Sequence, residues 1–343
     1  MKPLVSILIP AYNTEEWIGE TLQSAVAQTW PRKEIIVLND GSTDGTAEVA
    51  KRYASKGVKV VTTENGGLSA AVNRAYRVSQ GDYIQELDSD DILAPDKIEL
   101  QLSALRKGDS KRTLLSGPWA QFYYRTRRAQ FVPNSLWNDC SPVEWLLKKM
   151  EENLHMQNAT WLVSRELAEA AGPWDESLHY DQDGEYFCRV LMASEGTRFV
   201  AGAKIFYRMS GSGRISYIGA SEKKKISLLR SMKLHVQYLR SLEESDRVRK
   251  ACLSYLQRRS WQFYPEQPDM FAELQALAAE LQGRVELPVL RWKYNWMTPV
   301  FGLNTAKWAQ RVIPETKSWF KRHWDKTMFN LETRQGANYT ANG

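Results

Sequence analysis

The first hundred residues alternate short apolar runs with amphipathic segments. Four apolar runs predict strands, at residues 4–9, 34–38, 58–61 and 82–87. The segments between them carry apolar side chains at helical spacing and predict helices, at residues 14–26, 43–57 and 68–78. Apolar runs without alternation are typical of parallel strands that are buried on both faces. The repeated strand–helix–strand unit therefore predicts an α/β fold with a doubly wound, mostly parallel sheet flanked by helices.

The pattern loosens after Pro95 and becomes purely helical toward the C-terminus. The middle of the chain predicts helices over 96–106, 143–151 and 185–193, and strands over 119–124, 160–163, 198–200 and 205–207. After residue 221 only helices are predicted, over 222–241, 245–261 and 269–282. We therefore expect an α/β domain over residues 1–215 with halves at 1–105 and 106–215, a basic, aromatic-rich helical extension over 216–335, and a frayed tail over 336–343.

The net charge of +6 is distributed unevenly along the 343 residues. Residues 216–343 contain 21 Lys and Arg against 12 Asp and Glu, a net charge of +9, whereas residues 1–215 contain 25 against 28. A basic region of this kind suits an anionic membrane surface, a nucleic acid or a charged substrate, and it also fits the solvated surface of a helical region. No motif for groove or single-strand binding accompanies it, so we expect no nucleic-acid partner.

The cysteines and the N-terminus bear on the cellular compartment. Cys140, Cys188 and Cys252 lie far apart and form no C-x-x-C pair, and the four histidines are scattered. This spacing supports neither a zinc module nor a disulfide framework, and it fits reduced thiols. The apolar run at 4–9 is too short for a signal peptide, and no segment has the length needed to span a bilayer. We therefore expect a cytoplasmic protein.

Three polar loops follow predicted strands at one edge of the predicted sheet, at residues 10–13, 39–44 and 88–91. In an open parallel sheet, ligands bind beyond the carboxyl ends of the strands, so these loops predict a ligand site. Ordinary turn chemistry also explains the Asn, Asp, Gly and Ser residues of 39–44. The acidic loop is more specific, because its three carboxylates repel each other unless a cation or solvent intervenes. Carboxylate oxygens of this kind suit Mg²⁺ or Mn²⁺.

Four motifs in order and at matching spacing resemble those of family 2 glycosyltransferases. They are VSILIPAYN at 5–13, NDGSTD at 39–44, ENGGLSAA at 64–71, and GDY at 81–83 followed by LDSDD at 87–91. The resemblance implies the GT-A fold. It also implies metal-dependent transfer of one sugar, hexosyl or related, from a nucleoside diphosphate donor, with UDP as the expected nucleotide. The implied acceptor is a hydroxyl of a glycan or lipid-linked sugar, and the implied stereochemistry is inversion at the anomeric carbon.

The resemblance also implies roles for individual residues. The loop at 10–13 would line the base pocket, and Asp40 would contact the base or the ribose. Asp90, together with Asp88, would hold Mn²⁺ or Mg²⁺ on the donor diphosphate, which lies near the start of the following helix. The full set implied to bind the nucleotide sugar is Pro10, Ala11, Tyr12, Asn13, Asp40, Asn65, Gly67, Ser69, Asn73, Asp88 and Ser89.

The segment QDGEYFCR at 182–189 resembles the acceptor side of the same family and places Asp183 at the position of the catalytic base. A helix N-cap is an alternative role for Asp183, because Asp is among the best N-cap residues. The chain departs from the family pattern in three places. Val72 occupies a position where the family often has Arg, and Gln182 replaces the first acid of the usual pair. Met209 and Ser210 occupy a position where the family often has His. These departures keep a second hypothesis open, a catalytically degenerate protein that binds nucleotide sugars.

The C-terminal region is rich in both aromatic and basic residues, as in RWKYNW at 291–296 and WFKRHW at 319–324. This composition fits a segment that lies on a membrane surface. It also fits an amphipathic helix packed on the catalytic domain. A peripheral contact with an anionic membrane, at its inner face, is therefore one of two predictions for this region.

Overall fold

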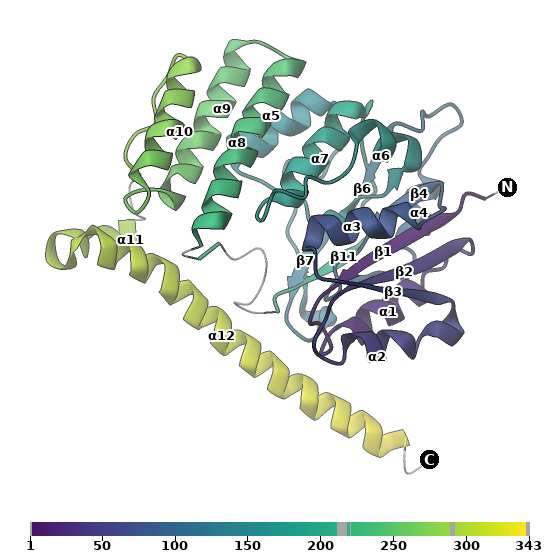
Figure 1. The fold of residues 1–343 in the computed structure, drawn as a ribbon. Helices are drawn as coiled ribbons and strands as arrows, with labels where there is room; N and C mark the ends of the chain where they lie inside the picture. Colours follow the sequence, from purple (N-terminus) through teal and green to yellow (C-terminus); the bar gives the residue numbers. More distant parts are fainter. Residues whose placement is uncertain (1, 211–217, 220, 289–291, 341–343) are drawn as a thin grey trace.

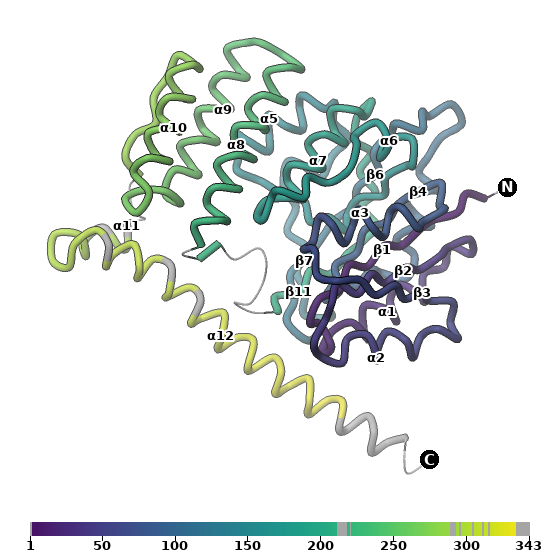
Figure 2. Tube along the Cα trace, viewed as in Figure 1, coloured from purple at the N-terminus to yellow at the C-terminus, as the bar shows by residue number. Residues whose placement is uncertain are grey.

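The computed structural model describes residues 2–210, 218–219, 221–288 and 292–340. An α/β half carries the N-terminus, a helical half stacks beside it, and a long C-terminal helix runs back beneath the α/β half (Figures 1 and 2). The predicted α/β fold with a C-terminal helical part is therefore confirmed.

The main sheet has five strands in the order β3-β2-β1-β4-β9. They are β1 (Val5–Ala11), β2 (Lys33–Asp40), β3 (Val58–Thr63), β4 (Tyr83–Glu86) and β9 (Val163–Ser164). The first four run parallel, and β9 pairs antiparallel with β4. All seven residues of β1 are buried, as a central strand covered on both faces requires. The predicted mostly parallel sheet is confirmed.

Helices cover both faces of this sheet (Figure 1). They are α1 (Ile18–Val26) and α2 (Thr46–Lys51) on one face and α3 (Leu68–Arg77) on the other. Alternate residues of β1 serve the two faces: Ile7 packs in the same core cluster as Leu22 of α1, and Leu8 in the same cluster as Ala75 of α3. The sheet is therefore doubly wound, as the sequence predicts.

The second part of the chain adds smaller sheets and more helices. A four-stranded sheet has the order β5-β11-β7-β8, and β10 pairs with β6. The strands are β5 (Ile92–Leu93), β6 (Thr113–Ser116), β7 (Trp119–Phe122), β8 (Gln130–Phe131), β10 (Gly196–Phe199) and β11 (Ile205–Arg208). The helices are α4 (Lys97–Ser103), α5 (Pro142–Glu152), α6 (Arg165–Ala171) and α7 (Gln182–Ala193).

One predicted strand of this part differs from the structure. Residues 160–163 do not form a continuous strand, because Asn158–Thr160 is a 3-10 turn and β9 begins only at Val163. Trp161 lies between them and is 2% exposed, so its side chain packs in the core as expected from its apolar surroundings. The 3-10 turn places Asn158 at the candidate site, where it contacts Asp88.

The C-terminal part is helical, with α8 (Glu222–Leu242), α9 (Asp246–Arg259), α10 (Pro268–Glu280), α11 (Trp292–Asn295) and α12 (Thr298–Thr340). The three helices predicted after residue 221 are confirmed. One hydrophobic core is shared by Trp161 and Phe187 with Val236 and Tyr255 of α8 and α9. The helices therefore continue the hydrophobic core of residues 106–210, and the predicted boundary at residue 215 lies outside the described residues.

Helix α12 changes direction at Gly302, whose φ of +80° is not helical. It then extends beneath the α/β half (Figure 1). Residues 336–340, expected as a frayed tail, are helical, and 341–343 lie outside the described residues. Among the helices of the described part, none combines the length and the apolar composition needed to cross a bilayer.

Candidate active site

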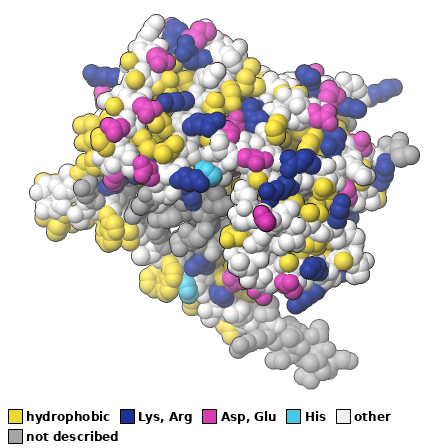
Figure 3. All heavy atoms as spheres, in the orientation of Figure 1, with side chains coloured by type: hydrophobic (Ala, Val, Ile, Leu, Met, Phe, Trp, Pro, Cys, Tyr) yellow, Lys and Arg dark blue, Asp and Glu magenta, His cyan; other side chains and the backbone are white. Residues whose placement is uncertain are grey.

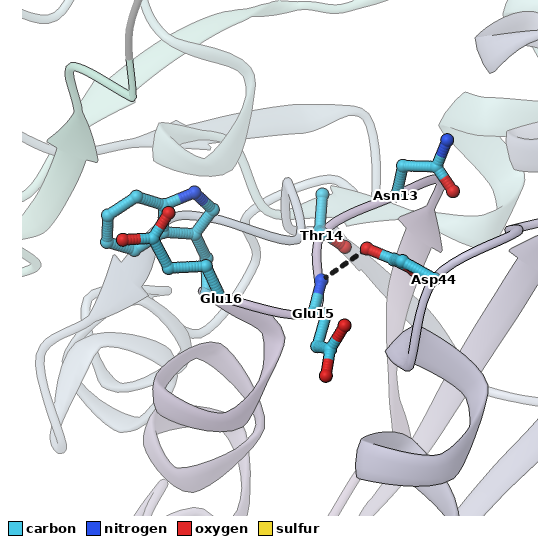
Figure 4. Close-up of a pocket in the computed structure, with 6 residues that line it drawn as sticks. Asn13, Thr14, Glu15, Glu16 and Asp44 are labelled. Atoms are coloured by element: carbon cyan, nitrogen blue, oxygen red, sulfur yellow. Dashed lines mark hydrogen bonds between the residues drawn. The ribbon is translucent and has the colours of Figure 1, made fainter.

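Hydrogen bonds between side chains and backbone N–H groups join the loops that follow β1 and β2. The backbone N–H of Asn13 donates to Ser42 Oγ at 3.1 Å, and the N–H of Thr43 donates to Asn13 Oδ1 at 2.8 Å. The N–H of Glu15 donates to Asp44 Oδ2 at 3.1 Å (Figure 4). These bonds let Asn13 adopt a φ of +51°, in the left-handed region that Asn tolerates better than most residues.

An open, polar hollow of about 550 Å³ lies where these two loops meet (Figure 4). Its lining comes from Asn13, Thr14, Glu15, Glu16, Trp17 and Asp44. Of the predicted base-pocket residues, Pro10 and Ala11 are buried in β1, and Tyr12 is 50% exposed. The sequence-predicted loops 10–13 and 39–44 are therefore brought together at the carboxyl edge of the sheet.

Asp40, at the end of β2, is 3% exposed and is held by the loop that precedes α3. The N–H groups of Gly66 and Gly67 donate to its two carboxylate oxygens, each at 2.9 Å, and Asn65 Nδ2 donates to its carbonyl at 3.0 Å. Arg74 Nη1 lies 3.4 Å from the same carboxylate. A Cβ at Gly66 would come within 3.0 Å of the Ala70 Cβ, so a larger residue would require a local shift of the loop or of α3. Asp40 thus fixes the predicted nucleotide loop.

The N-terminus of α3 faces the same edge and has no side-chain cap. Gly67 is its N-cap, with a φ of +84°. In the next turn Ser69 is 3% exposed, and its hydroxyl has no hydrogen-bond partner among the described residues. Unsatisfied N–H groups and the helix dipole make such an N-terminus favourable for an anion. A donor-binding role for Ser69, whose hydroxyl is buried, stays a prediction.

Asn73 has a structural role that the sequence prediction did not include. Its Nδ2 donates to the carbonyl of Trp174 at 3.0 Å and to Glu176 Oε1 at 2.9 Å, and its Oδ1 accepts the N–H of Trp174 at 2.9 Å. Both ends of the amide are therefore engaged in joining α3 to the segment before α7. Direct contact of Asn73 with the donor stays a prediction.

The acidic loop after β4 separates into two kinds of carboxylate. Asp91 is fully buried and points inward, where its Oδ1 accepts the N–H of Arg208 at 2.7 Å and its Oδ2 accepts from Gln157 at 2.5 Å. Asp88 and Asp90 are partly exposed. Ser89 is buried, and its carbonyl accepts from Thr21 at 3.0 Å. Asp88 and Asp90 are therefore the two carboxylates of the cluster that reach the surface, at the positions that the sequence predicts.

Asp88 is oriented by two amide side chains that the sequence prediction missed. Asn158 Nδ2 donates to Oδ1 at 2.9 Å, and Gln157 Nε2 donates to Oδ2 at 3.3 Å. Burial, followed by the charge of Asp90, raises the pKa of Asp88 to about 7, and the charge of Asp183 acts in the same direction. A divalent cation would relieve this crowding, so the donor set fits Mg²⁺ or Mn²⁺. Among the described residues, no group of three or more His, Cys, Asp or Glu side chains is placed to hold a metal ion by itself.

Arg208 also contacts the acidic loop, and the sequence analysis did not predict this role. Its side chain is fully buried, and Nε donates to the carbonyl of Asp90 at 2.7 Å. Its Nη2 pairs with Glu20 at 2.6 Å, and its guanidinium lies 4.5 Å from the ring centroid of Trp17 and 4.4 Å from that of Phe122. A buried cation beneath two carboxylates partly offsets their repulsion.

Asp183 lies in the first turn of α7 and is not its N-cap. The N-cap is Asp181, which has a φ of +60°, so the alternative role predicted for Asp183 is wrong. Burial, followed by the charge of Asp181, raises the pKa of Asp183. The charge of Asp183 in turn acts on Asp88 and on Glu86. Asp183 therefore lies near enough to Asp88 and Glu86 for its charge to act on both.

Asp181 is held by α8, although it lies only two residues from Asp183. Ser231 Oγ donates to its Oδ2 at 2.8 Å, and His235 Nδ1 lies 3.9 Å from the same oxygen. Burial alone would raise the pKa of Asp181, but His235, Arg259 and Lys149 lower it. Since burial holds the pKa of His235 at about 3, the imidazole is neutral at pH 7 and the arginine and lysine supply the positive charge.

Glu86, on β4, is a buried carboxyl group close to the charges of Asp88 and Asp183. It is 6% exposed, and Trp174 Nε1 donates to its Oε1 at 3.1 Å. Burial raises the pKa of Glu86 to about 8, so the carboxyl is protonated at pH 7. No sequence signal singled out Glu86, because its neighbours on the strand do not reveal which face it occupies.

Comparison with solved structures identifies the fold. The crystal structure of S. aureus TarS residues 1–349 in complex with UDP-GlcNAc is 17% identical, with a TM-score of 0.65 and 81% of each chain covered. The mannosyltransferase PcManGT from Pyrobaculum calidifontis, in complex with GDP-Man and Mn²⁺, is 19% identical, with a TM-score of 0.54, 95% of this chain and 88% of that chain covered. The architecture is therefore that of the GT-A glycosyltransferases.

Sequence comparison points in the same direction. Residues 6–169, a little under half of the chain, match the family model described as glycosyl transferase family 2. An uncharacterized glycosyltransferase of Rickettsia typhi is 34% identical over 193 residues, which are 56% of this chain and 60% of that protein. The chain therefore spans three fifths of that relative's length.

Proposed function

We propose that the protein is an inverting glycosyltransferase that moves one sugar from a UDP-sugar to a hydroxyl of a glycan or lipid-linked acceptor. The observation that carries this proposal is the position of Asp183 at the start of α7, where its charge acts on Asp88 at the end of β4. One side of the site offers a carboxylate pair for a cation and its diphosphate. The other side offers a separate carboxylate for the acceptor.

The donor is assigned to the loops at the carboxyl ends of β1, β2 and β3. Tyr12, which is half exposed, lies beside the predicted base pocket, and Asp40 holds the Gly66–Gly67 loop in place. Ser69 and the N-terminus of α3 suit the diphosphate. UDP is favoured as the nucleotide because TarS, which shares the fold, binds UDP-GlcNAc. The sugar itself is not assigned.

Asp90 and Asp88 would hold Mn²⁺ or Mg²⁺, with diphosphate oxygens and water completing the ligand shell. The raised pKa of Asp88 supports this assignment, because it reflects burial and negative charge that a cation would offset. PcManGT, whose fold is similar, binds GDP-Man with Mn²⁺. When bound, the metal would supply charge neutralisation for the departing diphosphate.

Asp183 would accept the proton of the acceptor hydroxyl as that oxygen attacks the anomeric carbon. Burial raises its pKa, and a carboxylate with a raised pKa is a stronger base than an exposed one while it remains ionised. Asp181, kept ionised by Arg259 and Lys149, fixes the start of α7. Attack from the side opposite the leaving diphosphate would give the inversion that the family resemblance implies.

A thermal-shift panel with UDP, GDP, dTDP and CMP, each with and without Mn²⁺, tests the donor assignment. Ligands that bind only the folded state raise the melting temperature, so UDP with Mn²⁺ should give the largest shift. A larger shift with GDP would reassign the base. Release of sugar from the donor in the presence of Mn²⁺ then separates an enzyme from the degenerate binding protein, which would bind UDP without releasing sugar. The cytoplasmic location stays a prediction.

A further inference from the structure

Helix α12 has an inner face that is tied to the α/β half by charge pairs. Asp325, which is 8% exposed, accepts the backbone N–H groups of Tyr124 and Arg125 at 2.9 and 3.1 Å, and its other oxygen accepts from Arg125 Nε at 2.7 Å. About two turns further along the helix, Glu332 pairs with Arg125 at 2.8 Å and also with Arg127. The packed-helix prediction for this region therefore holds for one face.

The opposite face of α12 presents large aromatic and aliphatic side chains to solvent. Because successive residues turn by about 100°, Trp319, Phe320 and Trp324 project away from the side that carries Asp325. The exposed set is Trp308 (57%), Ile313 (41%), Trp319 (49%), Phe320 (67%), Trp324 (68%) and Leu331 (49%). Hydrophobic side chains along α12 are visible below the body of the molecule in Figure 3. Contiguous exposed apolar surface of this kind marks an interaction site.

The inner face of α12 uses charges of both signs, since Lys326 on this face pairs with Glu16. Asp325 and Glu332, two acids whose side chains the structure describes, are both used in ion pairs on the inner face. Lys317 and Lys321 are exposed as well. At about 100° per residue they lie between the side that carries Asp325 and the aromatic residues. The outward side of the helix is therefore apolar and has lysines along one edge.

We propose that this outward face, the strip from Trp308 to Leu331, docks on the surface of an anionic lipid bilayer. At about 1.5 Å per residue the strip is roughly 35 Å long, and a planar lipid surface can cover all of it. Indole and phenyl rings favour the region between head groups and acyl chains, and the lysines beside them favour anionic head groups. The helix would lie in the interface rather than cross it, in agreement with its composition.

The contacts of the inner face place this docking strip next to the donor site. Lys326 Nζ lies 3.0 Å from Glu16 Oε1, and Glu16 lines the hollow between the first two loops. Tyr124 packs between Trp17 and Phe329 of α12, with ring centroids 5.2 and 6.0 Å apart. A protein docked through α12 would therefore hold its donor site close to the membrane. The proposal does not depend on the donor or the metal assigned above.

Co-sedimentation of the full chain with vesicles tests the proposal. Phosphatidylcholine vesicles containing about one quarter phosphatidylglycerol should pellet the protein at low salt and release it at about 0.5 M NaCl, because salt screens the lysines. The triple variant Trp319→Ala/Phe320→Ala/Trp324→Ala should lower the partition coefficient by roughly tenfold or more by removing the apolar anchor. Lys317→Glu/Lys321→Glu should lower it by at least about fivefold per residue.

The control variant Lys107→Glu/Lys111→Glu makes the same change in net charge at exposed lysines away from α12 and should bind vesicles like the wild type. All variants should keep the melting temperature and the UDP-induced shift, since the altered side chains are exposed. Absence of wild-type pelleting at low salt would overturn the proposal, as would equal losses in the control. Light scattering that shows a dimer, converted to monomer by the triple variant without vesicle binding, would assign the face to a second copy and likewise overturn it.

Discussion

The two sides of the site hold their carboxylates in different ways. On the donor side, Asp40 and Asp88 follow strands directly, and their partners are neighbouring loops and short polar side chains. On the acceptor side, the position of Asp183 depends on the start of α7. This helix start is fixed through Asp181, which accepts a hydrogen bond from Ser231, 50 residues further along the chain, and lies near Arg259 and Lys149. The donor side is thus a property of the sheet edge, whereas the acceptor side is a property of tertiary packing.

The largest effect that this comparison predicts is at Asp183. Asp183→Asn should lower transfer by roughly 10²- to 10⁴-fold, because the amide cannot accept the acceptor proton. UDP binding should be unchanged, since the donor side does not use this side chain. Steady-state transfer to the true acceptor and a UDP thermal shift measure the two quantities. Asp181→Asn is the matched control and should keep most of the transfer. If Asp181→Asn lost transfer and Asp183→Asn kept it, the base would be Asp181.

The second effect separates the metal from the rest of the donor side. Asp90→Ala should abolish the part of the UDP-induced stabilisation that needs Mn²⁺, which amounts to about 2.7 kcal/mol at a ligand concentration 100 times Kd. Chelation of the metal with EDTA should do the same to the wild type. Asp96→Ala, at an exposed acid whose side chain makes no capping hydrogen bond, is the control and should keep the shift. A metal-dependent shift that survives in Asp90→Ala would remove Asp90 from the metal site.

The third effect is a pH dependence on the acceptor side. The pKa of His235 is held at about 3 by burial, below the value of 6.5 that it has when exposed. The unfolded chain therefore binds a proton below about pH 6.5 that the folded protein excludes, so stability is lost as the pH falls. The loss should be roughly 2 kcal/mol at pH 5. Urea unfolding at pH 7.5 and 5 should show a loss that is larger in the wild type than in His235→Gln by about this amount, because His155, whose pKa burial also lowers, contributes equally to both proteins. Parallel behaviour of the two proteins would contradict the assignment.

The smallest effect concerns the link between α8 and α7. Ser231→Ala removes the hydrogen bond to the buried carboxylate of Asp181 and should cost on the order of 1 kcal/mol of unfolding free energy. Transfer should fall modestly while the Kd for UDP stays constant. Ser241→Ala, on the same helix, removes only a local bond to Tyr238 and serves as the control. Equal behaviour of the two variants would show that α8 does not position the start of α7.

The same contrast explains how much the sequence could predict. The strands of the main sheet and their loops follow from local patterns, so the sequence alone could place Asp40, Asp88 and Asp90 at one edge of the sheet. Gln157 and Arg208 could not be predicted, because each acts on Asp91 or Asp88 from about 70 to 120 positions away, and no local pattern reports such contacts. Asp181 rather than Asp183 occupies the N-cap position, and its carboxylate accepts from Ser231 instead of capping the helix, a contact that the residues around it do not reveal.

Arg125 gives the protein a particular order of events during synthesis. This arginine is 7% exposed, and the acids that pair with it lie 200 and 207 residues further along the chain. At about 5–20 residues per second, the ribosome delivers them roughly 10–40 s after the arginine itself. During that interval the α/β half can fold its sheet, yet it carries a cation whose partners do not exist. The region of the protein that is made first is therefore the region whose electrostatics are completed last.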